Sequence, residues 1–131
     1  MFSKLTEQGL NVCLIDADFR KKTTTKFFLH DIKVPKDLEE IKTNESKFMI
    51  GNSIVIPAVD TKNPIEILES KAFSNLYEDL TNRFDVVIVD TPPWFLFVDA
   101  EIVSRLTSSI LYVAKSHQTS EKDLILSLIH I

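Results

Sequence analysis

The sequence predicts an α/β fold in which a parallel β-sheet is covered by helices on both faces. Two short apolar runs, residues 12–15 and 86–89, each end directly in an aspartate, Asp16 and Asp90. Buried parallel strands are nearly continuous apolar runs, and ligands of such folds bind beyond the carboxyl ends of the strands. We therefore expect both aspartates at one edge of one sheet, where they could serve a nucleotide and a magnesium ion.

The other elements follow from local patterns along the chain. Apolar runs closed by turn or acidic residues predict four strands, over residues 11–15, 53–57, 86–89 and 109–114. Helical spacing and end signals predict short helices over residues 2–8, 37–41, 99–106 and from Ser120 onward. The basic, threonine-rich stretch 20–26 is expected to form a loop. This alternation of strands and helices is typical of a parallel sheet covered on both faces.

The clearest helical pattern covers residues 63–83. Asn63 is expected to be the N-cap, Pro64 suits the first helical position, and Glu66 follows three residues after the cap. Apolar side chains then recur at three- and four-residue spacing, at Ile65, Leu68, Ala72, Leu76 and Leu80. We expect one helix that packs its apolar face on the sheet.

Composition narrows the functional class. With 131 residues, 44% hydrophobic and 26% charged, the chain is long enough for one globular domain with a core. The net charge of −4 gives no electrostatic support for nucleic-acid binding. Cys13 is the only cysteine, so an internal disulfide is impossible and a reducing cytosol is expected. No apolar run reaches the ~20 residues of a membrane-spanning helix.

The chain has only two glycines, Gly9 and Gly51, and neither is placed to form a phosphate loop of the pattern G-x-x-x-x-G-K-[ST]. It also begins in a predicted helix directly before a strand. We therefore expect residues 1–131 to be a single partial domain, incomplete at both ends and lacking an N-terminal strand and phosphate loop.

The candidate site consists of three aspartates. Asp16 and Asp18 are separated by one residue, so on an extended strand both side chains point to the same side. Such like charges repel unless a cation or proton offsets them, so one acid could lie near a metal while the other acts as a base toward a hydroxyl. Asp90 could hold magnesium beside phosphates. The alternatives are that Arg20 pairs with Asp18 without any metal, and that Asp90 merely caps a turn. Asp99 is expected to be the N-cap of its helix.

Three segments resemble one known family. Residues 14–20 (LIDADFR) resemble the second Walker-type motif of bacterial tyrosine kinases, the capsule and exopolysaccharide regulators of the deviant-Walker P-loop class. Residues 63–70 match that family's N-P-x-E-L-L-x-S signature, and residues 84–93 with 99–100 match its Walker B block. The resemblance extends from about Leu5 to Thr119, nearly the whole chain.

This resemblance implies a P-loop-type domain that uses magnesium-ATP to phosphorylate tyrosines, largely on neighbouring copies of itself. It implies a homo-oligomer when intact, at the inner face of the bacterial plasma membrane, with a membrane polysaccharide chain-length protein as activating subunit or fused domain. Transferred by motif, Asp16 and Asp18 would serve the metal and the attacking hydroxyl, and Asp90 would serve magnesium. Arg20, Thr91 and Pro92 would contact the nucleotide.

Other interpretations remain open. The chain could be a partition- or septum-site-type ATPase switch without a tyrosine substrate. It could be a non-catalytic binding module that kept the sheet and lost the nucleotide, or a polypeptide that does not fold alone. Because the phosphate loop is absent, we expect poor ATP binding and no phosphate transfer by this chain as given, and we interpret it as a kinase fragment.

Overall fold

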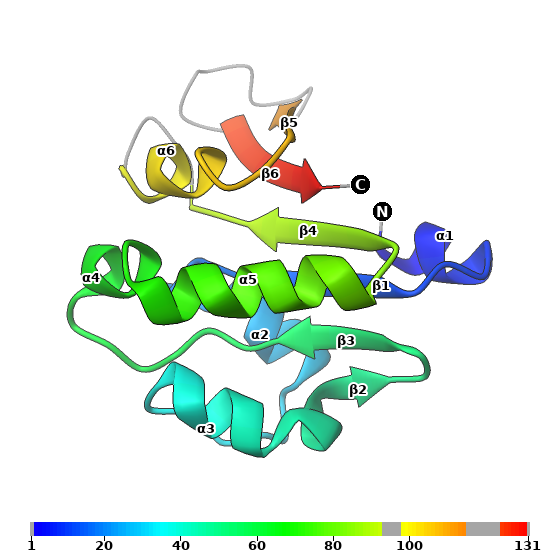
Figure 1. Ribbon diagram of the computed structural model, residues 1–131, viewed down its shortest axis with the longest axis horizontal. Helices are drawn as coiled ribbons and strands as arrows, with labels where there is room; N and C mark the ends of the chain where they lie inside the picture. Colours follow the sequence, from blue (N-terminus) through cyan, green and yellow to red (C-terminus); the bar gives the residue numbers. More distant parts are fainter. Residues whose placement is uncertain (1, 93–97, 115–123, 131) are drawn as a thin grey trace.

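In the computed structural model, which describes residues 2–92, 98–114 and 124–130, a six-stranded sheet forms the centre of the molecule (Figure 1). The strands follow the order β2-β3-β1-β4-β6-β5 across the sheet. Their bounds are β1 (Val12–Asp16), β2 (Met49–Ile50), β3 (Ser53–Ile56), β4 (Val86–Asp90), β5 (Ser109–Ala114) and β6 (Leu124–His130). β1 pairs in parallel with both β3 and β4, so the two acid-bearing strands are neighbours.

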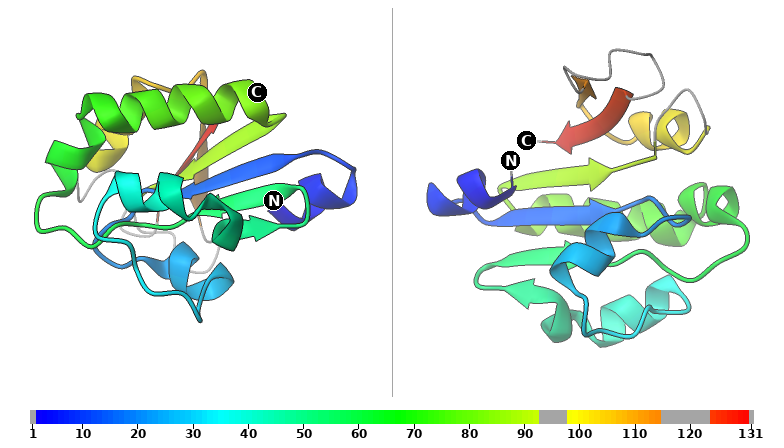
Figure 2. Two further views of the ribbon diagram at one scale, coloured as in Figure 1. Left: turned by 60° about the horizontal axis from the view of Figure 1, so that its bottom comes forward. Right: turned by 180° about the vertical axis from the view of Figure 1, so that it is seen from behind.

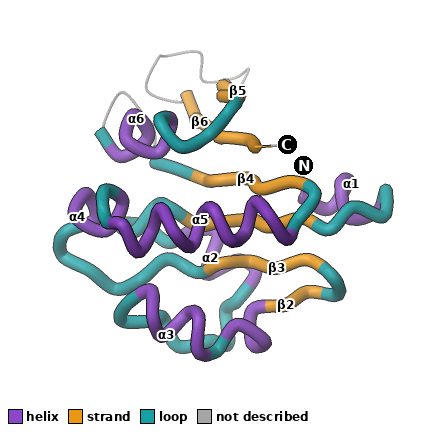
Figure 3. Tube along the Cα trace, viewed as in Figure 1, coloured by secondary structure: helices purple, strands orange, loops and turns teal. Residues whose placement is uncertain are grey.

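The four strands predicted from apolar runs are all present. β6 is antiparallel to both β4 and β5, so β5 runs in the same direction as β3, β1 and β4. The helix expected from Ser120 onward is wrong over residues 124–130, which form β6, whereas residues 120–123 lie outside the described part. β6 is a strand because its backbone pairs along both edges, with β4 on one side and β5 on the other (Figure 3).

Helices lie on both faces of the sheet, as the sequence predicts. Their bounds are α1 (Phe2–Glu7), α2 (Thr23–Phe28), α3 (Leu38–Thr43), α4 (Pro64–Leu68), α5 (Lys71–Arg83) and α6 (Asp99–Ser104), with a 3₁₀ turn η1 (Glu45–Phe48). α5 crosses one face while α2 lies on the other (Figure 2). Every residue of β1 and β3 is buried, which places the core around these strands.

The single helix expected over residues 63–83 is in fact two helices, α4 and α5. Asn63 makes no capping hydrogen bond through its side chain. The Ser70 hydroxyl instead accepts a hydrogen bond from the backbone N–H of Phe73 at 3.1 Å and donates one to the Ile67 carbonyl at 2.6 Å. Ser70 therefore ends the first helix and caps the second.

The loop expected over residues 20–26 is correct only as far as Lys22. Lys22 has a left-handed backbone conformation with φ of 54°, and α2 begins at the next residue, Thr23. The chain thus turns sharply after β1 and enters a helix, which returns the threonines to the sheet edge. In the described residues, no helix is long and apolar enough to cross a bilayer.

Candidate functional site

The two strand-terminal aspartates meet at the carboxyl edge of the sheet. Asp16 and Asp90 are register partners at the ends of β1 and β4. Beyond the strand ends, the Ala17 N–H donates to the Asp90 carbonyl at 2.7 Å and extends the pairing by one residue. The prediction that both acids lie at one edge of one sheet is confirmed.

Asp16 is completely buried, and protein donors occupy both of its carboxylate oxygens. Oδ1 accepts from the Asp18 N–H at 3.0 Å, while Oδ2 accepts from the N–H and the hydroxyl of Thr25, at 2.9 and 2.6 Å. The Thr25 hydroxyl also accepts from the Ala58 N–H at 2.8 Å. Asp16 therefore ties the first turn of α2 to β1, and Thr25 carries the connection on to the exit of β3.

Asp18 and Asp90 are less fully engaged. Oδ1 of Asp18 accepts from the N–H groups of Arg20 and Lys21, at 3.3 and 3.1 Å. Oδ2 of Asp90 accepts from the Thr24 hydroxyl at 2.5 Å. Within the described part of the chain, the second oxygen of each carboxylate accepts no hydrogen bond. Each acid therefore keeps one oxygen for a further partner.

The electrostatics of the cluster favour such a partner. Burial raises the pKa of Asp90 above its ordinary value of 3.8; the hydrogen bond from Thr24 opposes this, and the charges of Asp16 and Asp18 add to it. Burial likewise raises the pKa of Asp16, and the hydrogen bonds from Thr25 partly offset it. A buried carboxylate with further negative charges near it is stabilised by a cation or by a proton.

The donor set fits magnesium. Among the described residues, no three His, Cys, Asp or Glu side chains are arranged to enclose a metal ion. Mg²⁺ does not need such a cage, because it usually retains several waters and takes one or two carboxylates together with substrate phosphates. The hard oxygen donors left on Asp18 and Asp90 would be the residues to hold it.

Arg20 lies beside this cluster, but its side chain points to a residue whose role the sequence did not reveal. The guanidinium forms an ion pair with Oδ2 of Asp99, which is fully buried. The backbone N–H of Arg20, rather than the guanidinium, donates to Asp18. The N-cap expected at Asp99 is wrong: Val98 occupies that position, and Asp99 is the first residue of α6. In the sequence, only the opposite charges of Arg20 and Asp99 could have indicated that these two residues form an ion pair.

Thr91 and Pro92, the other expected nucleotide contacts, directly follow Asp90 and are both buried. Arg20 also borders an open cavity of about 360 Å³ whose other walls are residues 62–66. The contact of Arg20, Thr91 and Pro92 with a nucleotide stays a prediction.

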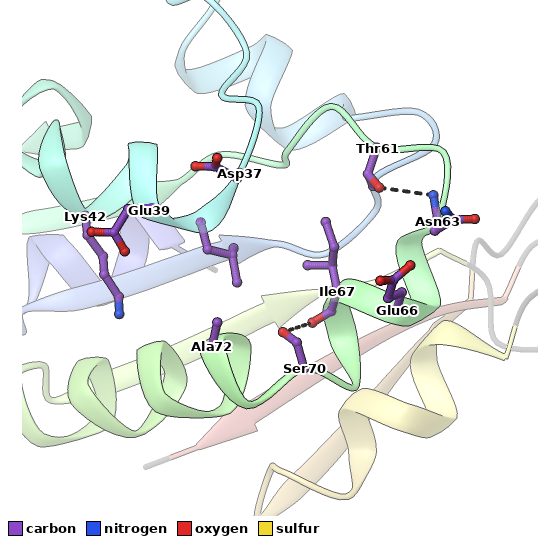
Figure 4. Close-up of a pocket in the computed structure, with 10 residues that line it drawn as sticks. Asp37, Glu39, Lys42, Thr61, Asn63, Glu66, Ile67, Ser70 and Ala72 are labelled. Carbon is purple, nitrogen blue, oxygen red and sulfur yellow. Dashed lines mark hydrogen bonds between the residues drawn. The ribbon is translucent and has the colours of Figure 1, made fainter.

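A larger cavity of about 490 Å³ lies away from the acids, between α3 and the α4–α5 junction (Figure 4). Asp37, Glu39 and Glu66 give it an acidic rim, and Ile67 and Ala72 contribute apolar walls. None of the three site aspartates lines it, so its size does not identify the chemical site. We place that site at the acid cluster.

Comparison with known proteins agrees with this geometry. A family model described as ATPase MipZ matches residues 1–109, most of the chain. The chain belongs to this family. It is a deviant-Walker P-loop family, the class that the Walker-type segments predict.

Bacterial tyrosine kinases are among the curated relatives of this chain. Tyrosine-protein kinase ptk of Acinetobacter johnsonii is 33% identical over 131 residues, which cover 95% of this chain and 18% of ptk. Tyrosine-protein kinase YwqD of Bacillus subtilis is 32% identical over 126 residues, covering 88% of this chain and 52% of YwqD. The chain therefore spans about half or less of these relatives.

The fold also matches a solved kinase domain. The kinase domain of the Escherichia coli tyrosine kinase ETK superposes with a TM-score of 0.61 at 26% identity. The match covers 78% of this chain and 42% of the ETK domain. The resemblance to bacterial tyrosine kinases and the P-loop-like α/β fold are thus confirmed.

Proposed function

We propose that this chain is part of an ATP-dependent protein-tyrosine kinase that phosphorylates neighbouring copies of itself and regulates capsular or exopolysaccharide synthesis and export. The observation that carries the proposal is that Asp90 ends β4 beside the end of β1, Asp18 lies in the turn just beyond β1, and each of these two carboxylates has one oxygen that accepts no hydrogen bond among the described residues. The names of the relatives support the same activity.

The roles of the residues follow from their contacts. When bound, magnesium-ATP supplies the phosphoryl group and neutralises charge during its transfer. Asp90 and Asp18 would hold the magnesium ion of that ligand, and the Thr24 hydroxyl fixes the orientation of the Asp90 carboxylate. Asp16 keeps α2 and its threonines at the sheet edge. Of the Asp16–Asp18 pair, Asp18 would accept the proton of the attacking tyrosine hydroxyl, because both oxygens of Asp16 already accept hydrogen bonds from the protein.

The cellular setting belongs to the same proposal. We place the complete protein at the inner face of the plasma membrane, bound or fused to a membrane polysaccharide chain-length protein and assembled with further copies of itself. Nucleic acid is not among the expected partners, because the net charge is −4.

The test is autophosphorylation of the protein expressed from the complete reading frame that contains this chain. The protein is incubated with ATP and Mg²⁺, and phosphotyrosine is measured by immunoblot and mass spectrometry. Asp90→Asn should reduce the rate at least 100-fold. Asp85→Asn is the matched control, because Asp85 directly precedes the same strand at its other end, is exposed, and accepts only from the Asn11 N–H at 2.8 Å among the described residues. Full activity of the Asp90→Asn protein would refute the assignment.

A second candidate is an ATPase switch without a tyrosine substrate, which the ATPase family model favours. It predicts that the complete protein hydrolyses ATP, in an Asp90-dependent way, while no phosphotyrosine forms. A protein with neither activity, and without a phosphate loop in its complete reading frame, would instead be a non-catalytic binding module.

A further inference from the structure

The ion pair between Arg20 and Asp99 joins the two segments that leave the acid-bearing strands. Arg20 lies two residues after Asp18, in the turn that follows β1. Asp99 lies nine residues after Asp90 and begins α6. The contact therefore connects the turn that holds one acid to the helix that follows the other.

Asp99 is the fixed end of this connection. Its side chain is completely buried, and the next residues of the helix, Ala100, Ile102 and Val103, belong to the hydrophobic core. Within the described residues, Oδ1 of Asp99 has no hydrogen-bond partner, so Arg20 is the group that compensates its charge. A buried carboxylate without a cationic partner is strongly destabilised, which holds the guanidinium in place.

Arg20 is the adjustable end. Its side chain is 32% exposed, and its backbone belongs to a tight turn around Asp18. In that turn, Oδ1 of Asp18 accepts from the N–H groups of Arg20 and Lys21, and the Asp18 carbonyl accepts from the Lys22 N–H at 2.9 Å. Anchoring the guanidinium thus restrains the same residue whose N–H orients the Asp18 carboxylate.

We propose that Asp99 is a positioning residue of the site: through Arg20, it fixes the turn that orients Asp18 and so sets the position of Asp18 relative to Asp90. The catalytic consequence depends on the proposed kinase function. The structural consequence does not, because it concerns only the order of the turn and the affinity of Asp18 and Asp90 for a divalent cation.

The experiment compares two charge-neutralising substitutions on the same helix in the protein from the complete reading frame. Asp99→Asn removes the charge that holds Arg20. Glu101→Gln is the matched control, since Glu101 is exposed and pairs with Arg105 at 3.9 Å one turn along α6. Hydrogen exchange of peptides covering residues 17–22 reports the turn, and peptides covering β1 report the core.

In Asp99→Asn we expect the amides of Arg20 and Lys21 to exchange at least 10-fold faster, while the β1 amides keep their rates. Mn²⁺ affinity, followed by the electron paramagnetic resonance of the free ion, should fall about 10-fold. In the kinase assay the half-saturating Mg²⁺ concentration should rise by a similar factor. Glu101→Gln should match the unsubstituted protein in all three measurements.

A double-substitution test asks whether Asp99 acts through Arg20. If it does, adding Asp99→Asn to Arg20→Gln should weaken Mn²⁺ binding by less than 2-fold beyond Arg20→Gln alone. Independent, multiplicative effects would overturn the proposal, as would unchanged exchange of the turn in Asp99→Asn. If Asp99→Asn fails to fold, Arg20→Lys, which keeps the charge that compensates Asp99 but not the forked geometry, is measured instead. Faster exchange of the turn with unchanged β1 amides would support the proposal, and unchanged exchange of the turn would overturn it.

The two proposals fail in different ways. If the complete protein forms no phosphotyrosine, the kinase function fails, while hydrogen exchange and Mn²⁺ binding still decide whether Asp99 positions the turn. If phosphotyrosine forms but both of these are unchanged in Asp99→Asn, the positioning role fails and the kinase function stands.

Discussion

Thr25 provides the sharpest test of how the site is built, because a single hydroxyl connects three elements. It donates to Asp16 at 2.6 Å and accepts from the Ala58 N–H at 2.8 Å, and Thr25 itself is 2% exposed. Thr25→Val keeps the shape of the side chain and removes only the hydroxyl. The substitution leaves a buried N–H without a partner and takes one donor from a buried carboxylate.

The magnitude follows from these two losses. A hydrogen bond to a charged group contributes about 1.5–3 kcal/mol, and an unpaired buried donor costs about 1–3 kcal/mol. Asp16 keeps its bonds from the N–H groups of Thr25 and Asp18, which places the total near the lower end. We expect Thr25→Val to lower the free energy of unfolding by about 3–4 kcal/mol.

The assay is urea unfolding followed by far-ultraviolet circular dichroism, with Thr25→Ser as the matched control. Serine keeps the hydroxyl and removes one buried methyl group, so its effect should be about 1 kcal/mol. Comparing the unfolding free energies of the two variants separates the effect of losing the hydroxyl from the effect of losing apolar packing. Equal destabilisation by valine and serine would show that the hydroxyl does not join the three elements.

Three further predictions concern protonation and helix capping. Burial raises the pKa of Asp16 and Asp90, so at mildly acidic pH the folded chain retains protons that the unfolded chain has lost. The free energy of unfolding should therefore fall as pH rises from about 4 through the higher folded pKa values. Urea titrations at several pH values should show this decline, and Asp90→Asn should make it less steep. Burial also raises the pKa of the Cys13 thiol, so Ellman's reagent at pH 8 should react at the rate of unfolding, and immediate reaction would contradict its burial. Ser70→Ala should destabilise the fold by about 1 kcal/mol, and Asn63→Ala by less than about 0.5 kcal/mol, because the Ser70 side chain makes a capping hydrogen bond and the Asn63 side chain does not.

The sheet and its acidic edge could be predicted because both depend on local sequence. An apolar run that ends in aspartate predicts three features from one short segment: a strand, the burial of that strand, and the position of the acid at its end. Parallel pairing of two such strands then brings Asp16 and Asp90 together without further information. The expectation that Asp18 continues the extended strand beside Asp16 is wrong, because β1 ends at Asp16 and Asp18 lies in the turn immediately beyond it.

The errors arose where a distant contact decides the local structure. Three consecutive threonines, residues 23–25, have weak helix propensity, yet they begin α2. The Asp16 carboxylate, nine residues before Thr25, accepts the N–H of that residue and so supplies a partner for the first turn. The apolar run of β6 was ambiguous for a related reason: periodicity alone does not distinguish a buried strand from a buried helix. Its pairing with β4 and β5 makes the difference.

The sequence predicts different roles for Asp16 and Asp18, one near a metal and one as a base, but it does not say which acid has which role, and the hydrogen bonds distinguish them. Three donors from the protein occupy both oxygens of Asp16, so a cation at Asp16 would have to displace bonds that hold α2 in place. Asp18 and Asp90 each keep an oxygen for a ligand while the protein orients the other. We infer that Asp16 builds the site and that Asp18 and Asp90 carry its metal chemistry. This division follows from the donors around each carboxylate, which lie on α2 and on the turn after β1, and so it requires the folded chain to be seen.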